Sequence, residues 1–340
     1  MDARPRRGRR ARRGRELSVR VGVTGAAGYV GRAVVRALAA RGHEVVALAR
    51  GDAAVPDAAR TVRGDLLAPA TLAPFAAGLD ACVHAAAYVH RRDDAPGARA
   101  ACFAVNEGGT RALLAALAAA RAPWLVFVSS TAVYGECSRG AREDRPPAPV
   151  SAYGESKLAA ERAVLAARAA GTPAACVLRP CVVVGPGAPG NAARLAALVR
   201  RGVVPLVRGG ANARSVVHVD DLADAAARAV EAGPAADGRV WNVAGAPITV
   251  RAMVEAVARG LGVRARWVPV PGALYDAAAA LASWASAASG GRLPDLGRRL
   301  EVFAGEATVD GGAIARDLGV VYRPSEAAVE QAARETAAVT

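Results

Sequence analysis

Short apolar runs alternate with longer amphipathic stretches through the first half of the chain. The short runs predict strands, and they fall at residues 18–23, 44–49, 61–66, 80–86, 124–130 and 174–180. Between most of them, apolar residues recur at helical spacing, as over residues 32–41. Strands that alternate with helices in this way predict an α/β fold built on a doubly wound parallel sheet.

The first strand runs directly into a glycine-rich loop. The loop reads Thr-Gly-Ala-Ala-Gly-Tyr-Val-Gly over residues 24–31, and the helix follows at once. Glycines permit a tight turn and a close approach to a pyrophosphate, while the helix N-terminus faces the phosphates. The G-x-x-G-x-x-G spacing has a first gap one residue longer than the commoner fingerprint. We therefore expect a Rossmann-like dinucleotide site, with a plain turn as the alternative; its loop residues are Gly25, Gly28, Tyr29, Val30 and Gly31.

The ends of the third and fourth strands extend this predicted cofactor site. Asp65 and Leu66 end the third strand, where they would meet the adenine, although Asp65 also suits a strand-end cap. Ala85 and Ala86 end the fourth strand, and their small side chains let a cofactor pass closely. His84, on an apolar strand, is predicted to be a hydrogen-bonded core histidine rather than a metal ligand. We expect no metal site.

Two further positions bear on the cofactor. In NAD-preferring proteins an acid ends the second strand and binds the ribose hydroxyls, but here Ala49 stands there and Arg50 follows. A missing carboxylate and an added guanidinium both favour NADP, with NAD as the second choice; Asp52 is close enough to pair with Arg50. Asn106 is expected either to cap a helix or to bind the backbone or an ordered water near the nicotinamide.

One lysine occurs among the 44 basic residues, and it lies in Tyr153-Gly-Glu-Ser-Lys157. The stretch that follows is rich in strong helix formers, so Tyr153 and Lys157 share one helix face. A nearby cation lowers a tyrosine pKa, as a proton shuttle requires. Ser130 and Thr131 follow the fifth strand, at the edge where open α/β sheets bind ligands. We therefore expect proton-transfer chemistry here; the alternative is a chance Tyr and Lys on an exposed helix.

Seven motifs in order carry a resemblance to a known family. They are Thr24-Gly-Ala-Ala-Gly-Tyr-Val-Gly, Gly64-Asp-Leu, His84-Ala-Ala-Ala, Val105-Asn-Glu-Gly-Gly-Thr, Ser129-Ser-Thr-Ala-Val-Tyr-Gly, Tyr153-Gly-Glu-Ser-Lys and Leu178-Arg-Pro. From about residue 18 to about 335 the chain resembles the extended short-chain dehydrogenase/reductase family, the NAD-dependent epimerase/dehydratase group. The resemblance implies a triad in which Tyr153 moves the proton, Ser130 holds the reacting oxygen, and Lys157 holds the ribose and lowers the tyrosine pKa. It also implies a homodimer through helices near residues 107–121 and 154–170.

The same resemblance points to a substrate class. Arg214 matches a diphosphate-binding arginine of sugar-nucleotide enzymes, and Asn191 precedes a predicted helix, so with Ser130 and Thr131 they form the expected substrate site. Dehydratases of the group carry an Asp-Glu pair where Thr131 and Ala132 stand, and 4-epimerases usually carry Asn where Val182 stands. We expect a 4-ketoreductase or epimerase acting on a nucleotide-linked sugar. The alternatives are a hydroxysteroid-dehydrogenase-like or dihydroflavonol-reductase-like enzyme on an apolar alcohol or ketone, and a catalytically idle Rossmann protein that senses a cofactor.

The expected domain organisation follows from these assignments. Residues 17–182 would form the dinucleotide-binding part, to which a segment at about 214–245 returns. Residues 183–213 and 246–340 would form a smaller, interleaved C-terminal substrate-binding region.

Composition narrows the function classes further. Apolar residues make up 53% of the 340 residues and aromatic residues only 4%, which argues against recognition of single-stranded nucleic acid by stacking. The five cysteines, an odd number without a C-x-x-C spacing, indicate neither a disulfide framework nor a zinc site. We expect them to be small buried residues in a reducing, cytoplasmic compartment.

The N-terminal segment carries half of the net charge of +14, because eight arginines and one aspartate lie in residues 1–15. Residues 1–16 are predicted to be a disordered tail. Binding of nucleic acid or anionic lipid, targeting and an inert tail are the competing interpretations, and we favour the inert one. No apolar segment follows the arginines, so a secretory signal is not indicated. The apolar stretch near 273–289 is shorter than the roughly 20 residues of a membrane span, and we expect it to cover the substrate.

Overall fold

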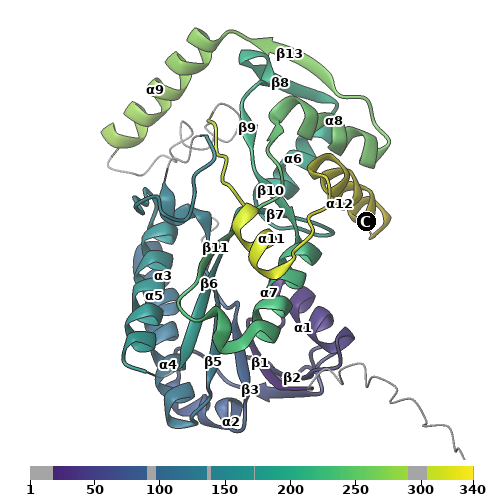
Figure 1. The fold of residues 1–340 in the computed structure, drawn as a ribbon. Helices are drawn as coiled ribbons and strands as arrows, with labels where there is room; N and C mark the ends of the chain where they lie inside the picture. The colour runs from purple at the N-terminus through teal and green to yellow at the C-terminus, as the bar shows by residue number, and fades with distance from the viewer. Residues whose placement is uncertain (1–17, 90–96, 136–138, 172, 290–304, 340) are drawn as a thin grey trace, which may run out of the picture.

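The structure is a computed structural model that describes residues 18–89, 97–135, 139–171, 173–289 and 305–339. The predicted disordered tail and Cys137 lie outside the described residues. A seven-stranded sheet with strand order β11-β6-β5-β4-β1-β2-β3 is its central layer, and all neighbouring strands are parallel. The predicted α/β doubly wound sheet is confirmed (Figure 1).

The strands of this sheet match the apolar runs, with shorter ends. Their bounds are β1 Arg20–Thr24, β2 Glu44–Ala49, β3 Arg60–Arg63, β4 Ala81–His84, β5 Trp124–Val128, β6 Ala174–Pro180 and β11 Val240–Val243. The third strand ends at Arg63 rather than at Leu66, because the Asp65 amide donates to the Thr71 hydroxyl and turns the chain away.

Helices cover both faces of the sheet. One face carries α1 Tyr29–Ala40 and α7 Val219–Ala232. The other carries α2 Ala73–Ala76, α4 Gly109–Ala119 and α5 Ala152–Ala169, while α3 Ala98–Phe103 packs against α5 and continues through a π-helix, Ala104–Gly108, into α4. The helix predicted over residues 32–41 begins earlier, at Tyr29.

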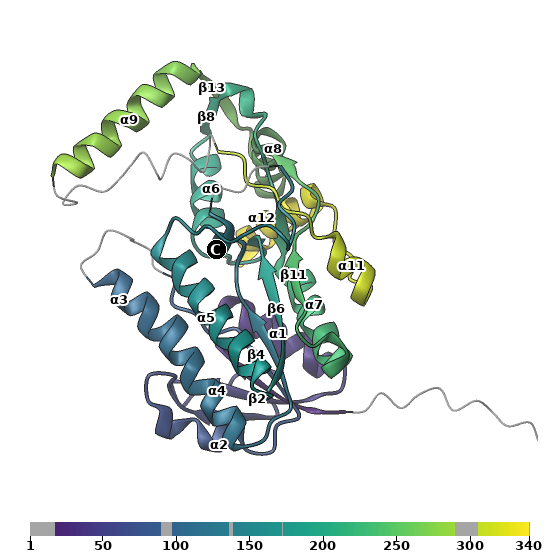
Figure 2. The same cartoon turned by 60° about the vertical axis from the view of Figure 1, so that its left-hand side comes forward.

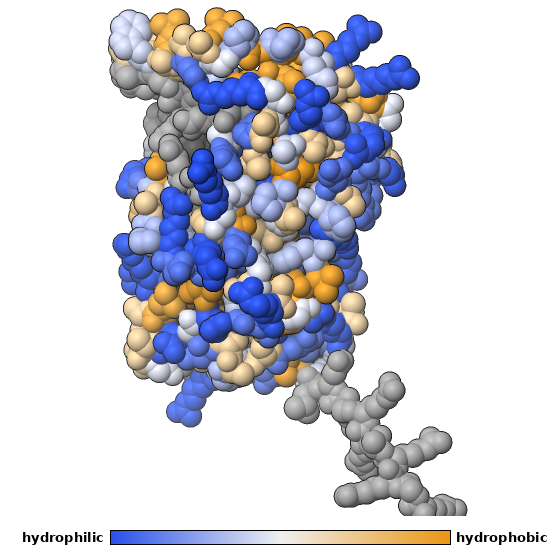
Figure 3. Space-filling model, turned by 45° about the horizontal axis from the view of Figure 1, so that its top comes forward, coloured by the Kyte–Doolittle hydropathy of each residue, from blue (hydrophilic) through white to orange (hydrophobic). Residues whose placement is uncertain are grey.

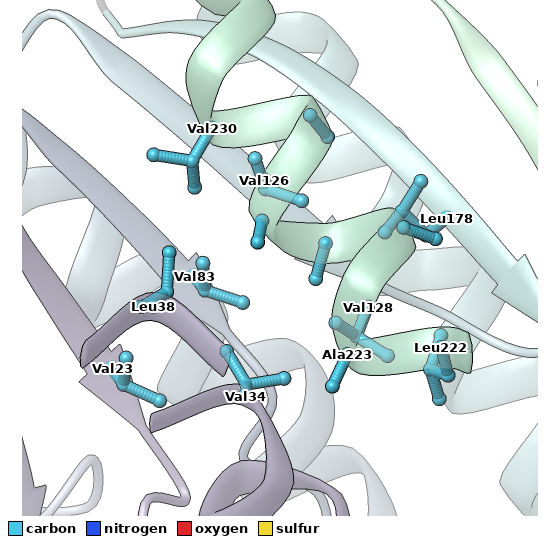
Figure 4. Close-up of a cluster of buried hydrophobic side chains, with 14 of the residues drawn as sticks. Val23, Val34, Leu38, Val83, Val126, Val128, Leu178, Leu222, Ala223 and Val230 are labelled. Atoms are coloured by element: carbon cyan, nitrogen blue, oxygen red, sulfur yellow. The ribbon is translucent and has the colours of Figure 1, made fainter. Parts of the chain in front are cut away.

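The core between α1, α7 and the sheet is made of small branched side chains. Leu38 of α1, Leu222 of α7 and Val126 of β5 are completely buried in it (Figure 4). Both faces of the sheet are covered in this way, which is why its strands read as continuous apolar runs instead of alternating ones.

Beyond β6 the chain builds smaller elements at the carboxyl ends of the strands (Figures 1 and 2). Paired strands there are β7 Val182–Val184 with β10 Val216–His218, β8 Val203–Val207 with β13 Arg266–Val270, and β9 Ala213–Arg214 with β12 Ile248–Thr249. The helices are α6 Asn191–Arg200, α8 Val250–Leu261, α9 Gly272–Ala288, α11 Gly312–Leu318 and α12 Ser325–Val339. Among the described residues no helix is both long and apolar enough to cross a membrane.

The surface mixes hydrophilic and apolar regions, and the described cysteines are unpaired. On the face drawn in Figure 3, hydrophilic side chains cover much of the surface between separate apolar patches. Cys82, Cys102 and Cys176 are buried and Cys181 is partly buried, all with free thiols. For these four residues the prediction of small, unpaired side chains is confirmed.

A buried ion pair joins α5 to β6. The Arg179 guanidinium donates to both carboxylate oxygens of Glu161, at 3.0 and 2.6 Å, and to the hydroxyl of Tyr134 at 2.8 Å. Tyr134 in turn donates to Asn242 of β11. The two charged side chains are 6% and 1% exposed, so each depends on the other for compensation of its lost hydration.

We predict that Glu161→Ala lowers the free energy of unfolding by about 3–5 kcal/mol, because it leaves the Arg179 charge buried and unpaired. The double variant Glu161→Leu/Arg179→Met removes both charges and should lose less. Arg36→Ala breaks an exposed pair with Asp220 and should cost no more than about 1 kcal/mol. Urea unfolding of the four proteins measures this. A Glu161→Ala loss as small as that of Arg36→Ala would contradict the assignment.

Candidate active site

The glycine-rich loop packs directly on the end of β4. Gly25 has a φ of +67°, and a Cβ placed on it would lie 2.7 Å from the backbone of Ala86. A Cβ on Gly31 would lie 2.0 Å from the carbonyl oxygen of Gly25, which also accepts the Gly28 amide at 2.8 Å. These glycines are therefore required by close backbone approach, and the turn they make leaves only backbone at its surface.

This loop fits a dinucleotide. The cap residue of α1 is Gly28, which offers no side chain to the first amides of the helix, so those N–H groups remain available to an anion. Within the described chain, the Tyr29 hydroxyl is buried without a hydrogen-bond partner. Val30 is partly buried and packs against the core beneath the loop. When bound, the nicotinamide cofactor supplies or accepts a hydride.

At the predicted adenosine end of the site, the structure places Arg50 just after the end of β2 and gives Asp52 a partner other than Arg50. Arg50 directly follows β2 and is exposed. Asp52, which is close enough in sequence to pair with Arg50, instead pairs with Arg63 of β3 at 3.1 Å, with both side chains largely exposed. The reason is register, since Arg63 stands opposite Ala49 in the neighbouring strand.

Asp65 and Leu66 have local structural roles. A carboxylate oxygen of Asp65 accepts the Leu67 amide at 3.0 Å, which is the strand-end cap considered as the alternative. Leu66 is buried, and a Cβ on Gly109 would lie 2.9 Å from its side chain. Leu66 therefore sets the position of α4 against β3.

His84 is a hydrogen-bonded core residue, as predicted. Its ring nitrogens lie 2.6 Å from the Thr24 hydroxyl and 2.9 Å from the Thr110 hydroxyl. Burial, and secondarily the charge of Lys157, lowers the His84 pKa to about 3, so the ring is neutral at physiological pH. Thr24 also accepts the Ala86 amide at 3.3 Å, and Ala85 and Ala86 stay partly buried at the edge of the site.

Asn106 binds backbone, one of its two predicted roles. It lies in the π-helix between α3 and α4, accepts the Tyr88 amide at 2.7 Å and donates to the Tyr88 carbonyl at 3.1 Å. Its amide also donates to the Ser156 hydroxyl, which donates to the Tyr153 carbonyl. Short π-helical turns are frequent at functional sites, and this one connects the Tyr88 segment to the helix turn that carries Tyr153.

Lys157 is 1% exposed and enters the sheet from α5. Its ammonium donates to the carbonyl oxygen of Val128 at 2.6 Å and lies 4.4 Å from the centre of the Phe127 ring. Burial lowers the Lys157 pKa to about 7, while the Glu161 carboxylate one helical turn away opposes this shift. The single lysine is thus held at the end of β5, next to the predicted catalytic serine.

Tyr153 and Ser130 come together from different elements. Ser130 follows β5 and accepts the Ala132 amide at 3.1 Å at the start of a short helical turn, Thr131–Tyr134. Tyr153 lies in the first turn of α5, which begins behind the cap residue Ser151. The Ser130 hydroxyl lies near enough to the Tyr153 phenol to lower its pKa, so the structure brings Ser130, Tyr153 and Lys157 toward the same end of β5.

The predicted lowering of the tyrosine pKa is wrong for the protein alone. Burial raises the Tyr153 pKa to about 12, and the hydrogen bond with Ser130 offsets only part of that shift. Lys157 does not reverse the shift, because its ammonium binds the Val128 carbonyl and its own pKa is depressed. Tyr153 is therefore protonated at neutral pH and is a proton donor rather than a ready base.

The expected substrate residues are only partly described. Thr131 is partly buried beside Ser130. Arg214 lies in β9, and its guanidinium donates to the carbonyl oxygen of Gly305 at 3.2 Å. Asn191 begins α6, but its side chain lies outside the described residues. Arg214 also borders a cavity of about 600 Å³ between β7, α6, α8 and α12, whose other lining residues are mostly apolar.

Several supporting residues escaped the sequence reasoning. Glu161, Arg179, Thr24, Thr110 and Ser156 are buried and carry the hydrogen bonds behind the triad. For Glu161 a signal existed, since it lies four residues after Lys157 and hence on the same helix face. The other four residues carried no such signal in the sequence, because their partners come from distant elements.

Comparison with known proteins identifies the family. The model of the NAD dependent epimerase/dehydratase family matches residues 21–244, and the chain belongs to that family. It is 31% identical over 317 residues, covering 90% of this chain and 92% of the relative, to a 4-hydroxy-2-methyl-3-oxo-4-farnesyl-3,4-dihydroquinoline-1-oxide ketoreductase of Stigmatella aurantiaca. The family is one of NAD(P)-dependent oxidoreductases and epimerases.

Two further matches bear on substrate and cofactor. A 2-alkyl-3-oxoalkanoate reductase of Stenotrophomonas maltophilia (strain K279a) is 32% identical over 257 residues, covering 71% of this chain and 75% of the relative. The solved structure described as "MoeE5 in complex with UDP-glucose and NAD" superposes with a TM-score of 0.70 at 26% identity, covering 93% of this chain and 98% of that one. The similar proteins thus include two enzymes named as reductases and one whose structure holds UDP-glucose and NAD.

The buried lysine makes the stability of the cofactor-free protein depend on pH. Between about pH 7 and pH 10.5 the unfolded chain keeps the Lys157 proton while the folded chain releases it, so stability rises with pH. We predict that wild type gains stability relative to Lys157→Met across this range, by up to about 1.4 kcal/mol per pH unit. Urea unfolding of both proteins from pH 6 to 10 measures the difference. A difference that stays constant with pH would contradict a depressed lysine pKa.

Proposed function

We propose that this protein is an NAD(P)H-dependent ketoreductase that interconverts a carbonyl group and the corresponding secondary alcohol. The observation that carries the proposal is the arrangement of Tyr153 and Lys157 on one helix, α5, with Lys157 bonded to the end of β5 just before Ser130. In the reducing direction, a nicotinamide cofactor held by the glycine loop would supply the hydride that the carbonyl carbon takes up. Tyr153 gives its phenolic proton to the carbonyl oxygen, and the phenolate regains a proton from solvent, so the product is the alcohol.

Each of the three residues has a distinct task. Tyr153, with its pKa raised to about 12, holds the proton that reduction consumes. Ser130 orients the carbonyl oxygen toward that proton. Lys157 binds the nicotinamide ribose; once charged there, it would favour the phenolate that forms as the proton leaves.

One feature of the sequence argues for reduction over elimination of water. Thr131 and Ala132, which follow Ser130, carry no carboxylate, whereas elimination needs an acid or base at that turn. Epimerisation requires the same groups to act on both faces of one carbon; it remains the second reaction type.

For the substrate we propose an apolar ketone or alcohol, with a nucleotide-linked sugar as the second candidate. The mainly apolar lining of the 600 Å³ cavity favours the first class, and so do the names of the two reductase relatives. Arg214 favours the second, since a guanidinium suits a diphosphate, although it already donates to the Gly305 carbonyl.

We also propose a homodimer in a cytoplasmic setting. The helices α4 and α5 lie side by side on one flank of the molecule (Figure 2), and exposed residues such as Arg111 and Arg162 lie on them. Light scattering coupled to gel filtration gives the mass in solution. A monomer at micromolar concentration would rule out this pairing.

Tyr153→Phe tests the proton donor. We predict a loss of kcat by about 10²–10⁴-fold, because general acid catalysis is removed, while the Kd for NADPH changes by less than about twofold. Steady-state kinetics with a ketone substrate and a fluorescence titration with NADPH measure the two quantities. Tyr88→Phe is the matched control and should keep its kcat. A Tyr153→Phe enzyme that retained more than about a tenth of the wild-type kcat would exclude the role.

We propose that NADP(H) is preferred to NAD(H). Ala49 ends β2 without a carboxylate, and Arg50 beside it is exposed and ready for a 2′-phosphate. Because Asp52 is paired with Arg63, it does not neutralise Arg50 as the sequence had suggested it might.

Arg50→Ala is predicted to lower kcat/KM for NADPH about tenfold or more and to leave the value for NADH within about twofold, since a charge-assisted bond contributes about 1.5–3 kcal/mol. Adding Ala49→Asp should move the preference to NADH. Arg60→Ala, an exposed arginine at the opposite end of the adjacent strand, is the control and should change neither value. A wild type that prefers NADH would refute the proposal.

A further inference from the structure

One cavity lies apart from the proton-transfer residues. It measures about 600 Å³ and is enclosed by β7, α6, α8 and α12, which group beyond the carboxyl ends of the sheet in Figure 1. Val184, Leu195, Val257 and Val329 are among its walls. Its volume is in the range of about 300–1,000 Å³ found for small-molecule sites.

Small side chains on facing helices create this space. Ala192 and Ala196 of α6 face Ala332 and Ala333 of α12 across the cavity. Protein interiors are normally close-packed, and the cost of an empty cavity rises with its volume. Water would need polar partners, which these walls scarcely provide, so an apolar ligand suits the cavity better than solvent.

Backbone continuity connects the cavity to the reaction site. Val182 and Val184 line it, and their strand β7 follows β6 after a single residue. β6 pairs with β5, which leads to Ser130. Gly185, also in the lining, lies against the cofactor loop, since a Cβ placed on it would be 2.4 Å from the Tyr29 hydroxyl. The cavity therefore borders the cofactor side of the active site.

All the charged residues that line the cavity are arginines. Arg194 and Arg200 are exposed on α6, and Arg214 is partly buried in β9; no carboxylate is among the residues that line the cavity. The positive charge of the arginines favours a ligand chain that also bears an acidic group over one that bears an amine.

We infer that this cavity binds the aliphatic chain of the carbonyl substrate, so that the substrate is an acyl- or alkyl-chain ketone rather than a compact polar one. This inference rests on the proposed ketoreductase function. It assigns substrate selection to the cavity, while Tyr153 and Ser130 act on the carbonyl group.

The test is a chain-length series. With NADPH and 2-alkanones from 2-pentanone to 2-dodecanone, we expect kcat/KM to rise about two- to fourfold per methylene as the chain fills the cavity. Ala196→Leu and Ala192→Phe narrow the cavity and should lower kcat/KM for 2-dodecanone at least about tenfold while leaving 2-pentanone within about twofold. Ala197→Phe, exposed on the same helix and outside the lining, is the matched control and should behave as wild type.

A binding measurement separates this inference from the proposed function. Decanoate should raise the melting temperature of the wild type and of Ala197→Phe, and raise it less in Ala196→Leu. If ketones are reduced with kcat/KM independent of chain length, or if the narrowing variants reduce 2-dodecanone as wild type does, the inference is overturned and the ketoreductase stands. If no ketone or alcohol reacts but decanoate binds with the expected variant pattern, the cavity assignment stands and the proposed function fails.

Discussion

The burial of one ammonium group organises this active site. Lys157 enters the sheet from α5 and has the Val128 carbonyl and the Phe127 ring as partners. A buried charge needs such partners. The contacts of Lys157 therefore fix where α5 packs along β5 and which face of the helix is turned toward the strand. Tyr153, one turn earlier on the helix, is thereby placed over the end of β5, where it meets Ser130. The Glu161–Arg179 pair anchors the next turn to β6, so three consecutive turns are fixed by buried polar contacts.

The parallel sheet sets the second constraint. Its strands end at one edge, where the glycine loop, Ala85, Ala86 and Ser130 lie. The close approach of Gly25 to Ala86 leaves no room for side chains, so the cofactor side of the site is made of backbone. The site therefore has few polar side chains, and two of them, Tyr153 and Lys157, come from one helix, α5.

The substrate side follows a different physical rule. There, alanines on α6 and α12 leave volume where large side chains would normally close-pack. The site thus combines a rigid, hydrogen-bonded region for proton transfer with an apolar space nearby. The ketone with an aliphatic chain that we propose as substrate would suit both regions.

The sequence by itself determined the fold class and pointed to Ser130, Tyr153 and Lys157 as candidate site residues. Short runs rich in apolar residues located the strands of the main sheet up to β6, because a parallel sheet covered on both faces buries most of its strand residues. The glycine spacing and the single lysine were equally local signals. The tertiary structure alone decided which partners those residues have: it paired Asp52 with Arg63 through strand register, raised the Tyr153 pKa through burial, and joined Glu161 to Arg179. It also decided where the chain leaves space, since a cavity depends on how distant helices face one another and not on any one segment.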